Sequence, residues 1–131
     1  MGTVSRKRKL QQIPPIFKDF IASVKRHFGF LEEDYGFDVI GPEFHGVECS
    51  IHYVKASTLA VSVLSEAGSV PWVRVTASDD GELREFTLDE YLQKYCMGAG
   101  PTLPISNSTC DAVIMAHSQA LRKCQDTLAH G

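Results

Sequence analysis

The sequence predicts an α+β fold: a single antiparallel sheet of four to five strands, with a leading amphipathic helix, a short helix after the sheet and a C-terminal amphipathic helix. Apolar residues near both ends of the chain recur every three or four positions, which is the period of an amphipathic helix. Between residues 37 and 86, apolar and polar residues alternate, which is the period of a half-buried strand. The links between these stretches are short, so neighbouring strands should be antiparallel.

Length and composition are those of one globular domain. The chain has 131 residues, of which 44% are hydrophobic and 22% are charged, and domains usually contain roughly 100–200 residues. We expect residues 1–13 to be a flexible basic leader and residues 14–131 to form a single α+β domain. The leader's cluster Arg6-Lys7-Arg8-Lys9 could bind nucleic acid or an acidic surface, or it could be a solvated tail.

The first helix should run from Pro14 to about Tyr35. Proline suits a first turn, because its missing N–H would be unpaired there anyway, and Gly36 suits the C-terminal cap. Gly29 would allow an earlier end. The apolar face of this helix carries Phe17, Phe20, Ile21, Val24, Phe28 and Leu31.

The strands are predicted from five apolar or alternating stretches. They cover residues 37–40, closed by Gly41-Pro42, and then residues 47–53, 59–63, 71–77 and 83–86. Asp79-Asp80-Gly81 predicts the turn before the last of them.

Two more helices should follow the sheet. Thr87-Leu88-Asp89-Glu90 has the form of a capping box and predicts a helix from Leu88 to about Cys96. Residues 97–107 should form a loop, and a last helix should begin near Ser108-Thr109. Its apolar face must pack on the rest of the chain; it contains Cys110, Val113, Ile114, His117, Leu121, Cys124 and Leu128.

The cysteines and the absence of targeting patterns favour a cytoplasmic protein. Cys49, Cys96, Cys110 and Cys124 form no CxxC pair and are typical of small core residues in a reducing compartment. A disulfide in an oxidising compartment is the alternative. The sequence shows neither a signal-peptide pattern nor an apolar run of membrane-spanning length.

Common catalytic and cofactor motifs are absent from the sequence, including phosphate loops, nucleophile elbows and HExxH. We therefore predict no catalytic residue, no cofactor and no metal. An enzyme with an unrecognised site remains an alternative, because catalytic groups can lie far apart in sequence. His45 and His52 could bind a metal together with Glu43 or Glu48, or they could be unliganded histidines on an exposed strand face.

Two features predict a surface for a protein partner. Glu32, Glu33 and Asp34 end the first helix, where the helix dipole disfavours carboxylates. The run could be solvated surface, the helix could be shorter, or the run could be a binding patch. Trp72 lies beside Arg74, a combination typical of interface hot spots, unless a helix covers it. The net charge of −3 favours a basic protein partner over nucleic acid.

The stretch Phe28–Phe37, followed later by Thr87-Leu88-Asp89, resembles a group of small uncharacterised bacterial α+β proteins. These proteins join a leading helix to a sheet meander and a short helix, and the similarity covers about residues 16–96. Some of them resemble toxin-neutralising immunity proteins of polymorphic toxin systems. The resemblance implies a non-enzymatic protein-binding domain and brings no catalytic residues with it.

A second resemblance is to the small acidic chaperones of type III secretion, which share the order of elements and work as dimers. The Phe28–Phe37 stretch fits the first group better. We therefore expect a protein partner, no nucleic acid and no membrane, and a homodimer stays open as an alternative.

Overall fold

The computed structural model describes residues 14–56, 58–67, 69–96, 109–124 and 128. The predicted leader, 1–13, and the predicted loop, 97–107, lie outside the described residues. The elements in order are η1 (Pro15–Phe17), α2 (Lys18–Tyr35), β1 (Asp38–His45), β2 (Glu48–Lys55), β3 (Leu59–Glu66), β4 (Trp72–Asp79), β5 (Glu82–Thr87), α3 (Leu88–Tyr95) and α4 (Cys110–Arg122).

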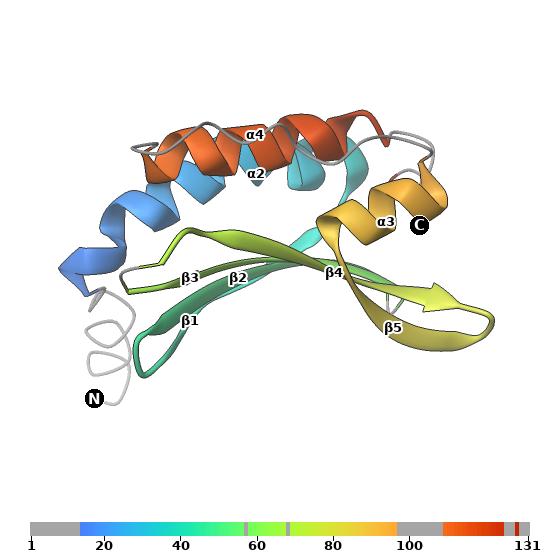
Figure 1. Ribbon diagram of the computed structural model, residues 1–131, viewed down its shortest axis with the longest axis horizontal. Helices are drawn as coiled ribbons and strands as arrows, with labels where there is room; N and C mark the ends of the chain where they lie inside the picture. Colours follow the sequence, from blue (N-terminus) through green and yellow to red (C-terminus); the bar gives the residue numbers. More distant parts are fainter. Residues whose placement is uncertain (1–13, 57, 68, 97–108, 125–127, 129–131) are drawn as a thin grey trace, which may run out of the picture.

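The five strands form one antiparallel sheet in the order β1-β2-β3-β4-β5. Helices α2 and α4 lie side by side across one face of this sheet, and α3 lies on the same side near β4 and β5 (Figure 1). The predicted α+β class with a single antiparallel sheet is confirmed. No helix of the described residues covers the opposite face, which we call the helix-free face.

The core fills the space between the helices and the sheet. All six apolar residues predicted for the first helix are buried, and so are the apolar positions predicted for β2, β3 and β4 apart from Val47. Along β4, buried residues alternate with half-exposed ones. Because successive strand residues point to opposite faces, the half-exposed Trp72, Arg74 and Thr76 belong to the helix-free face.

The predicted end of α2 is confirmed. Gly36 adopts a left-handed conformation with φ of 75°, which glycine adopts without the steric cost of a side chain. The Gly36 N–H donates to Glu32 O, and the Phe37 N–H donates to Leu31 O, so the last carbonyls of the helix are paired. The helix continues through Gly29, so the earlier end does not occur.

The first strand is longer than predicted. Gly41-Pro42 does not close it: β1 continues to His45 with an irregularity in pairing between Ile40 and Glu43. Proline is tolerated here because β1 is an edge strand with a bulge, where its missing N–H interrupts no ladder on the outer side. Val47, predicted as an inward residue of the next strand, precedes β2 and is exposed.

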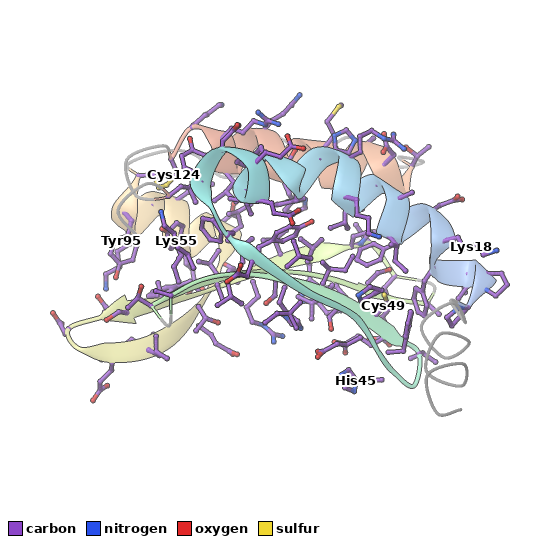
Figure 2. All side chains as sticks on the ribbon, turned by 180° about the vertical axis from the view of Figure 1, so that it is seen from behind. Lys18, His45, Cys49, Lys55, Tyr95 and Cys124 are labelled. Atoms are coloured by element: carbon purple, nitrogen blue, oxygen red, sulfur yellow. A yellow bond between two sulfur atoms is a disulfide. The ribbon has the colours of Figure 1, made fainter. Side chains whose placement is uncertain are left out.

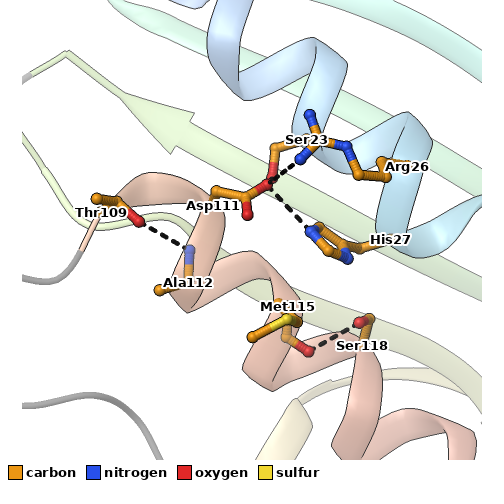
Figure 3. Close-up of polar contacts among 8 residues, drawn as sticks. All are labelled: Ser23, Arg26, His27, Thr109, Asp111, Ala112, Met115 and Ser118. Carbon is orange, nitrogen blue, oxygen red and sulfur yellow. Dashed lines mark hydrogen bonds and ion pairs between the residues drawn. The ribbon is translucent and has the colours of Figure 1, made fainter.

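The predicted starts of the last two helices are confirmed. Thr87 and Glu90 form the reciprocal capping box of α3. Thr109 caps α4 by accepting a hydrogen bond from the Ala112 N–H at 3.1 Å. Asp111 Oδ1, in the first turn of α4, then accepts hydrogen bonds from Ser23, Arg26 and His27 of α2 (Figure 3). This carboxylate fixes how α4 lies on α2.

The expectation of four reduced cysteines is wrong for one pair. Cys96, at the end of α3, and Cys124, just after α4, are joined by a disulfide, with Cα atoms 5.4 Å apart, within the usual span of such bonds. Cys49 and Cys110 are free. Disulfides persist mainly in oxidising compartments, so the cysteines no longer support the cytoplasmic prediction.

Candidate functional site

The helix-free face carries far more acidic than basic side chains. Register and alternation together assign each strand residue to a face. The carboxylates on this face come from four of the strands, against a single basic residue, Arg74. They are Asp38, Glu43, Glu48, Glu66 and Glu85. A surface of one sign attracts partners of the opposite sign.

Trp72 lies on this face beside a shallow depression. The depression has a volume of about 280 Å³ and is lined by residues of β4, β5 and the start of α3, including Trp72, Arg74, Glu85 and Glu90. Pockets that enclose small ligands usually measure roughly 300–1,000 Å³. The depression lies where β4, β5 and the start of α3 meet, and its size suits a protruding side chain of a protein better than an enclosed small molecule.

Arg74 is the basic residue at the centre of this region. Its guanidinium nitrogen Nη1 lies 3.8 Å from Glu85 Oε1, and both side chains are substantially exposed. An exposed pair of this kind contributes little to stability. Arg74 is therefore available to contact a partner without a large loss of folding free energy.

Two glutamates of this face oppose each other directly. Glu48 of β2 and Glu66 of β3 are Cα partners in the antiparallel register, and they point to the same side. Like charges directly opposite on paired strands are destabilising. Two glutamates at this position, where a neutral residue would fit, depart from the pattern that folding alone favours, which is typical of a functional surface.

A second polar cluster lies on the β1 and β2 side of the same face. His52 Nδ1 is 2.7 Å from Ser62 Oγ, and His52 Nε2 is 3.2 Å from Glu43 Oε1. His45 Nε2 is 3.9 Å from the same Glu43 oxygen. Figure 2 shows His45 on the side of the sheet away from the helices. The structure thus gathers the two histidines singled out in the sequence around one of the two predicted carboxylates.

Ser62, His52 and Glu43 have the composition of a nucleophile, base and carboxylate chain. The Ser62 side chain, however, is buried, at 7% exposure, in the middle of a strand that is paired on both sides. Its neighbouring backbone N–H groups belong to the sheet ladder, so they do not form a preorganised oxyanion hole. The geometry favours Ser62 as a partner that orients His52.

The two predicted partner-binding regions are not brought together. Glu32, Glu33 and Asp34 are exposed at the end of α2, on the side of the sheet opposite Trp72. Burial raises the pKa of Tyr53 to about 12, and the negative charge of Glu32 contributes to this rise. Because Tyr53 lies on the helix side of β2, Glu32 acts on that side of the sheet. One flat partner surface cannot contact both regions.

Sequence reasoning missed Glu66, Glu85 and Ser62 as members of the site. The alternation of Leu59, Val61 and Val63 places Ser62 on the outward face, so this position could have been inferred. Glu66 lies beyond the predicted stretch 59–63, and the stretch 83–86 has no alternation that assigns Glu85 to a face. Which of them lie beside Trp72 or His52 depends on strand register, and register appears only in the folded sheet.

Other polar groups have structural roles. Asp79 accepts hydrogen bonds from Tyr95 and Lys94 and so holds α3 to β4. His117 is buried, as predicted, with its Nδ1 2.8 Å from Val113 O. Burial lowers the pKa of His117, and the Val113 hydrogen bond partly offsets this, so the imidazole is neutral near pH 7.

No protein family, curated protein or solved structure matches this chain. The resemblance to immunity proteins therefore stays a prediction. None of the helices in the described ranges is long and apolar enough to cross a membrane.

Proposed function

We propose that this chain is a non-enzymatic protein-binding domain whose helix-free face binds a basic protein partner. The observation that carries the proposal is the placement of Trp72 and five carboxylates on one uncovered sheet face, with a depression beside Trp72. The proposal also covers the toxin-neutralising role, in which the partner is a basic toxin domain.

Trp72 supplies the expected anchor of this contact. A half-buried tryptophan loses its remaining exposed area when a partner covers it, and tryptophan and arginine dominate interface hot spots. Because Trp72 lies on β4, an interior strand of the sheet, and is paired there with Leu64 of β3, the anchor is held on a rigid support. A rigid anchor loses little conformational entropy on binding.

The carboxylates supply direction and choice of partner. Glu43, Glu48, Glu66 and Glu85 would speed encounter with a basic surface and repel nucleic-acid phosphates. Toxin domains that act on nucleic acids need basic surfaces to hold the phosphate backbone. Covering such a surface with an acidic sheet face would block its substrate by direct competition.

The test is the binding kinetics of the full chain with the protein encoded by the adjacent gene, because immunity genes neighbour their toxin genes. We expect Trp72→Ala to speed dissociation and weaken binding by about 2 kcal/mol, roughly 30-fold in Kd. We expect Glu66→Lys to slow association, and the slowing to diminish at high salt. Glu33→Lys, which makes the same change of charge at the end of α2, is the matched charge control on the opposite side.

Two results would contradict the proposal. One is unchanged kinetics for Trp72→Ala and Glu66→Lys together with slower association for the helix-end variant, which would move the interface to the end of α2. The other is a homodimer of the free chain, measured by analytical ultracentrifugation, that Trp72→Ala dissociates. That outcome would assign the helix-free face to a second copy.

A further inference from the structure

We propose that Glu43, His45 and His52 form a surface site for a divalent transition-metal ion, with Zn²⁺ as its ligand. This site is separate from the Trp72 depression, since it lies on β1 and β2 whereas the depression is lined by β4, β5 and α3. Two imidazole nitrogens and one carboxylate are a donor set that suits zinc and leaves a fourth position open.

The register of β1 and β2 explains why these groups converge. Glu43 lies opposite Ser50, whose small side chain leaves room above it, and His52 lies two residues further along β2. His45 lies two residues from Glu43 on β1, so it points to the same face. The carboxylate of Glu43 therefore lies between the two imidazoles.

The distances approach those of a zinc site. The donors of a tetrahedral zinc are about 3.3 Å apart, given bonds of about 2.0–2.1 Å. His52 Nε2 and Glu43 Oε1 are already 3.2 Å apart, and His45 Nε2 is 3.9 Å from the same oxygen. As the side chains stand, no group of three or more His, Cys, Asp or Glu residues within the described ranges is arranged to hold a metal ion, so binding requires His45 to move. The His45 side chain is 68% exposed, so it is free to rotate and bring its Nε2 to the distance from Glu43 Oε1 that a shared zinc ion requires.

Ser62 supports the site from below. For His52 Nε2 to bind a metal, its proton must reside on Nδ1, and Ser62 Oγ, 2.7 Å away, can accept a hydrogen bond from that N–H. Metal-bound histidines almost always donate their second ring N–H in this way, which fixes ring orientation. The buried serine thus acts as a positioning residue.

The test is isothermal titration calorimetry of the full chain with Zn²⁺. We expect one equivalent to bind and Ser62→Ala to weaken binding by about 10-fold to 100-fold. His45→Ala, His52→Ala and Glu43→Gln, which each remove a ligand, should weaken it at least as much. Glu85→Gln, which removes a carboxylate from the same face across the sheet, is the matched control and should bind as the wild type does.

A second measurement uses the wild-type chain, so it tests the proposal even where a variant fails to fold. On addition of Zn²⁺ to the wild-type chain, the NMR signals of the His45 and His52 rings should shift, and those of the buried His117 ring should not. A Co²⁺-loaded sample should show no thiolate charge-transfer band, since no cysteine is a ligand. Failure to bind Zn²⁺, wild-type affinity in both histidine variants or a thiolate band would each overturn the proposal.

Discussion

Glu48 and Glu66 show, at the scale of single residues, how a surface for binding can cost stability. Their direct opposition across β2 and β3 brings two negative charges together at a position where opposite charges would help the sheet. The repulsion lowers the free energy of unfolding of the isolated chain, and a positive group of a partner placed over both carboxylates would remove it. The same pair therefore connects the stability of the sheet to the charge of its partner.

Glu66→Lys should consequently stabilise the isolated protein while slowing its association with a basic partner. The new Lys–Glu pair should raise the free energy of unfolding by about 0.5 kcal/mol, measured by urea denaturation. Glu33→Lys, on the exposed end of α2, is the control for association only: it should leave the association rate unchanged, while its own stability should also rise because it removes a carboxylate from a helix C-terminus. A destabilised Glu66→Lys protein would show that the two carboxylates do not repel each other in the fold.

Asp111 joins α4 to α2 through three side-chain hydrogen bonds. Its Oδ1 lies 2.7 Å from Ser23 Oγ and 3.0 Å from groups of Arg26 and His27 (Figure 3). The Ser23 hydrogen bond is the largest of the effects that lower the pKa of Asp111; partial burial opposes them. Because the folded-state pKa lies below the unfolded value, this carboxylate stabilises the fold above the unfolded-state pKa, and the contribution is lost as pH falls through the folded-state pKa.

Asp111→Asn should lower the free energy of unfolding at pH 7 by about 1 kcal/mol, a modest value because the site is half exposed. The difference between variant and wild type should shrink as the pH is lowered below about 4. Thermal unfolding across pH 3–7 measures both effects. Gln119→Ala, exposed on the same helix, is the control, and a pH-independent difference would contradict the assignment.

At the scale of elements, the spacing of apolar residues predicted which side of a helix or strand packs against the core. All the apolar residues predicted for the first helix are buried, because the helix covers the sheet with one stripe, and Thr87 and Thr109 cap the later helices. The prediction omitted Phe30, which is buried outside that stripe beneath Arg122 of α4. The length of β1 was not predictable in the same way. Gly41-Pro42 is a stop signal in most strands, and only the position of β1 at the edge of the sheet makes it tolerable.

The capping box gives a prediction for α3. Thr87→Ala removes the acceptor of the Glu90 N–H hydrogen bond and should lower the free energy of unfolding by about 1 kcal/mol. Chemical denaturation measures this loss, with Gln93→Ala, exposed in the same helix, as the control. Equal stability of the two variants would mean that packing of Tyr91 and Leu92 alone determines where α3 begins.

At the scale of the whole molecule, the disulfide joins the C-terminal end of α3, at Cys96, to the chain just after α4, at Cys124. Its connectivity could not be deduced from the sequence, because four cysteines allow several pairings. Only the folded chain brings Cys96 and Cys124, 28 residues apart in sequence, within bonding distance. The same reason explains why the sequence pointed to Trp72 but could not show that it lies on the opposite side of the sheet from Glu32.

The Cys96–Cys124 disulfide closes a loop between residues that are 28 apart in sequence. Because this restricts the unfolded chain, the bond should stabilise the fold by about 3–4 kcal/mol in the chain-entropy model. The double variant Cys96→Ser/Cys124→Ser, or reduction of the wild type, should lower the free energy of unfolding by up to that amount. Cys110→Ser, which removes a free thiol, is the control for loss of a cysteine. Identical unfolding of the wild type with and without reductant would show that the bond is absent.

The central claim is that the acidic helix-free face is the contact surface for a basic protein. Carboxyl labelling by a carbodiimide, located by mass spectrometry with and without the adjacent gene's protein, tests it most directly. We expect Glu48, Glu66 and Glu85 to lose reactivity in the complex while Glu32, Glu33 and Asp34 keep theirs. Protection of the helix-end carboxylates with unchanged labelling of the sheet face, or no complex with that protein, would contradict it.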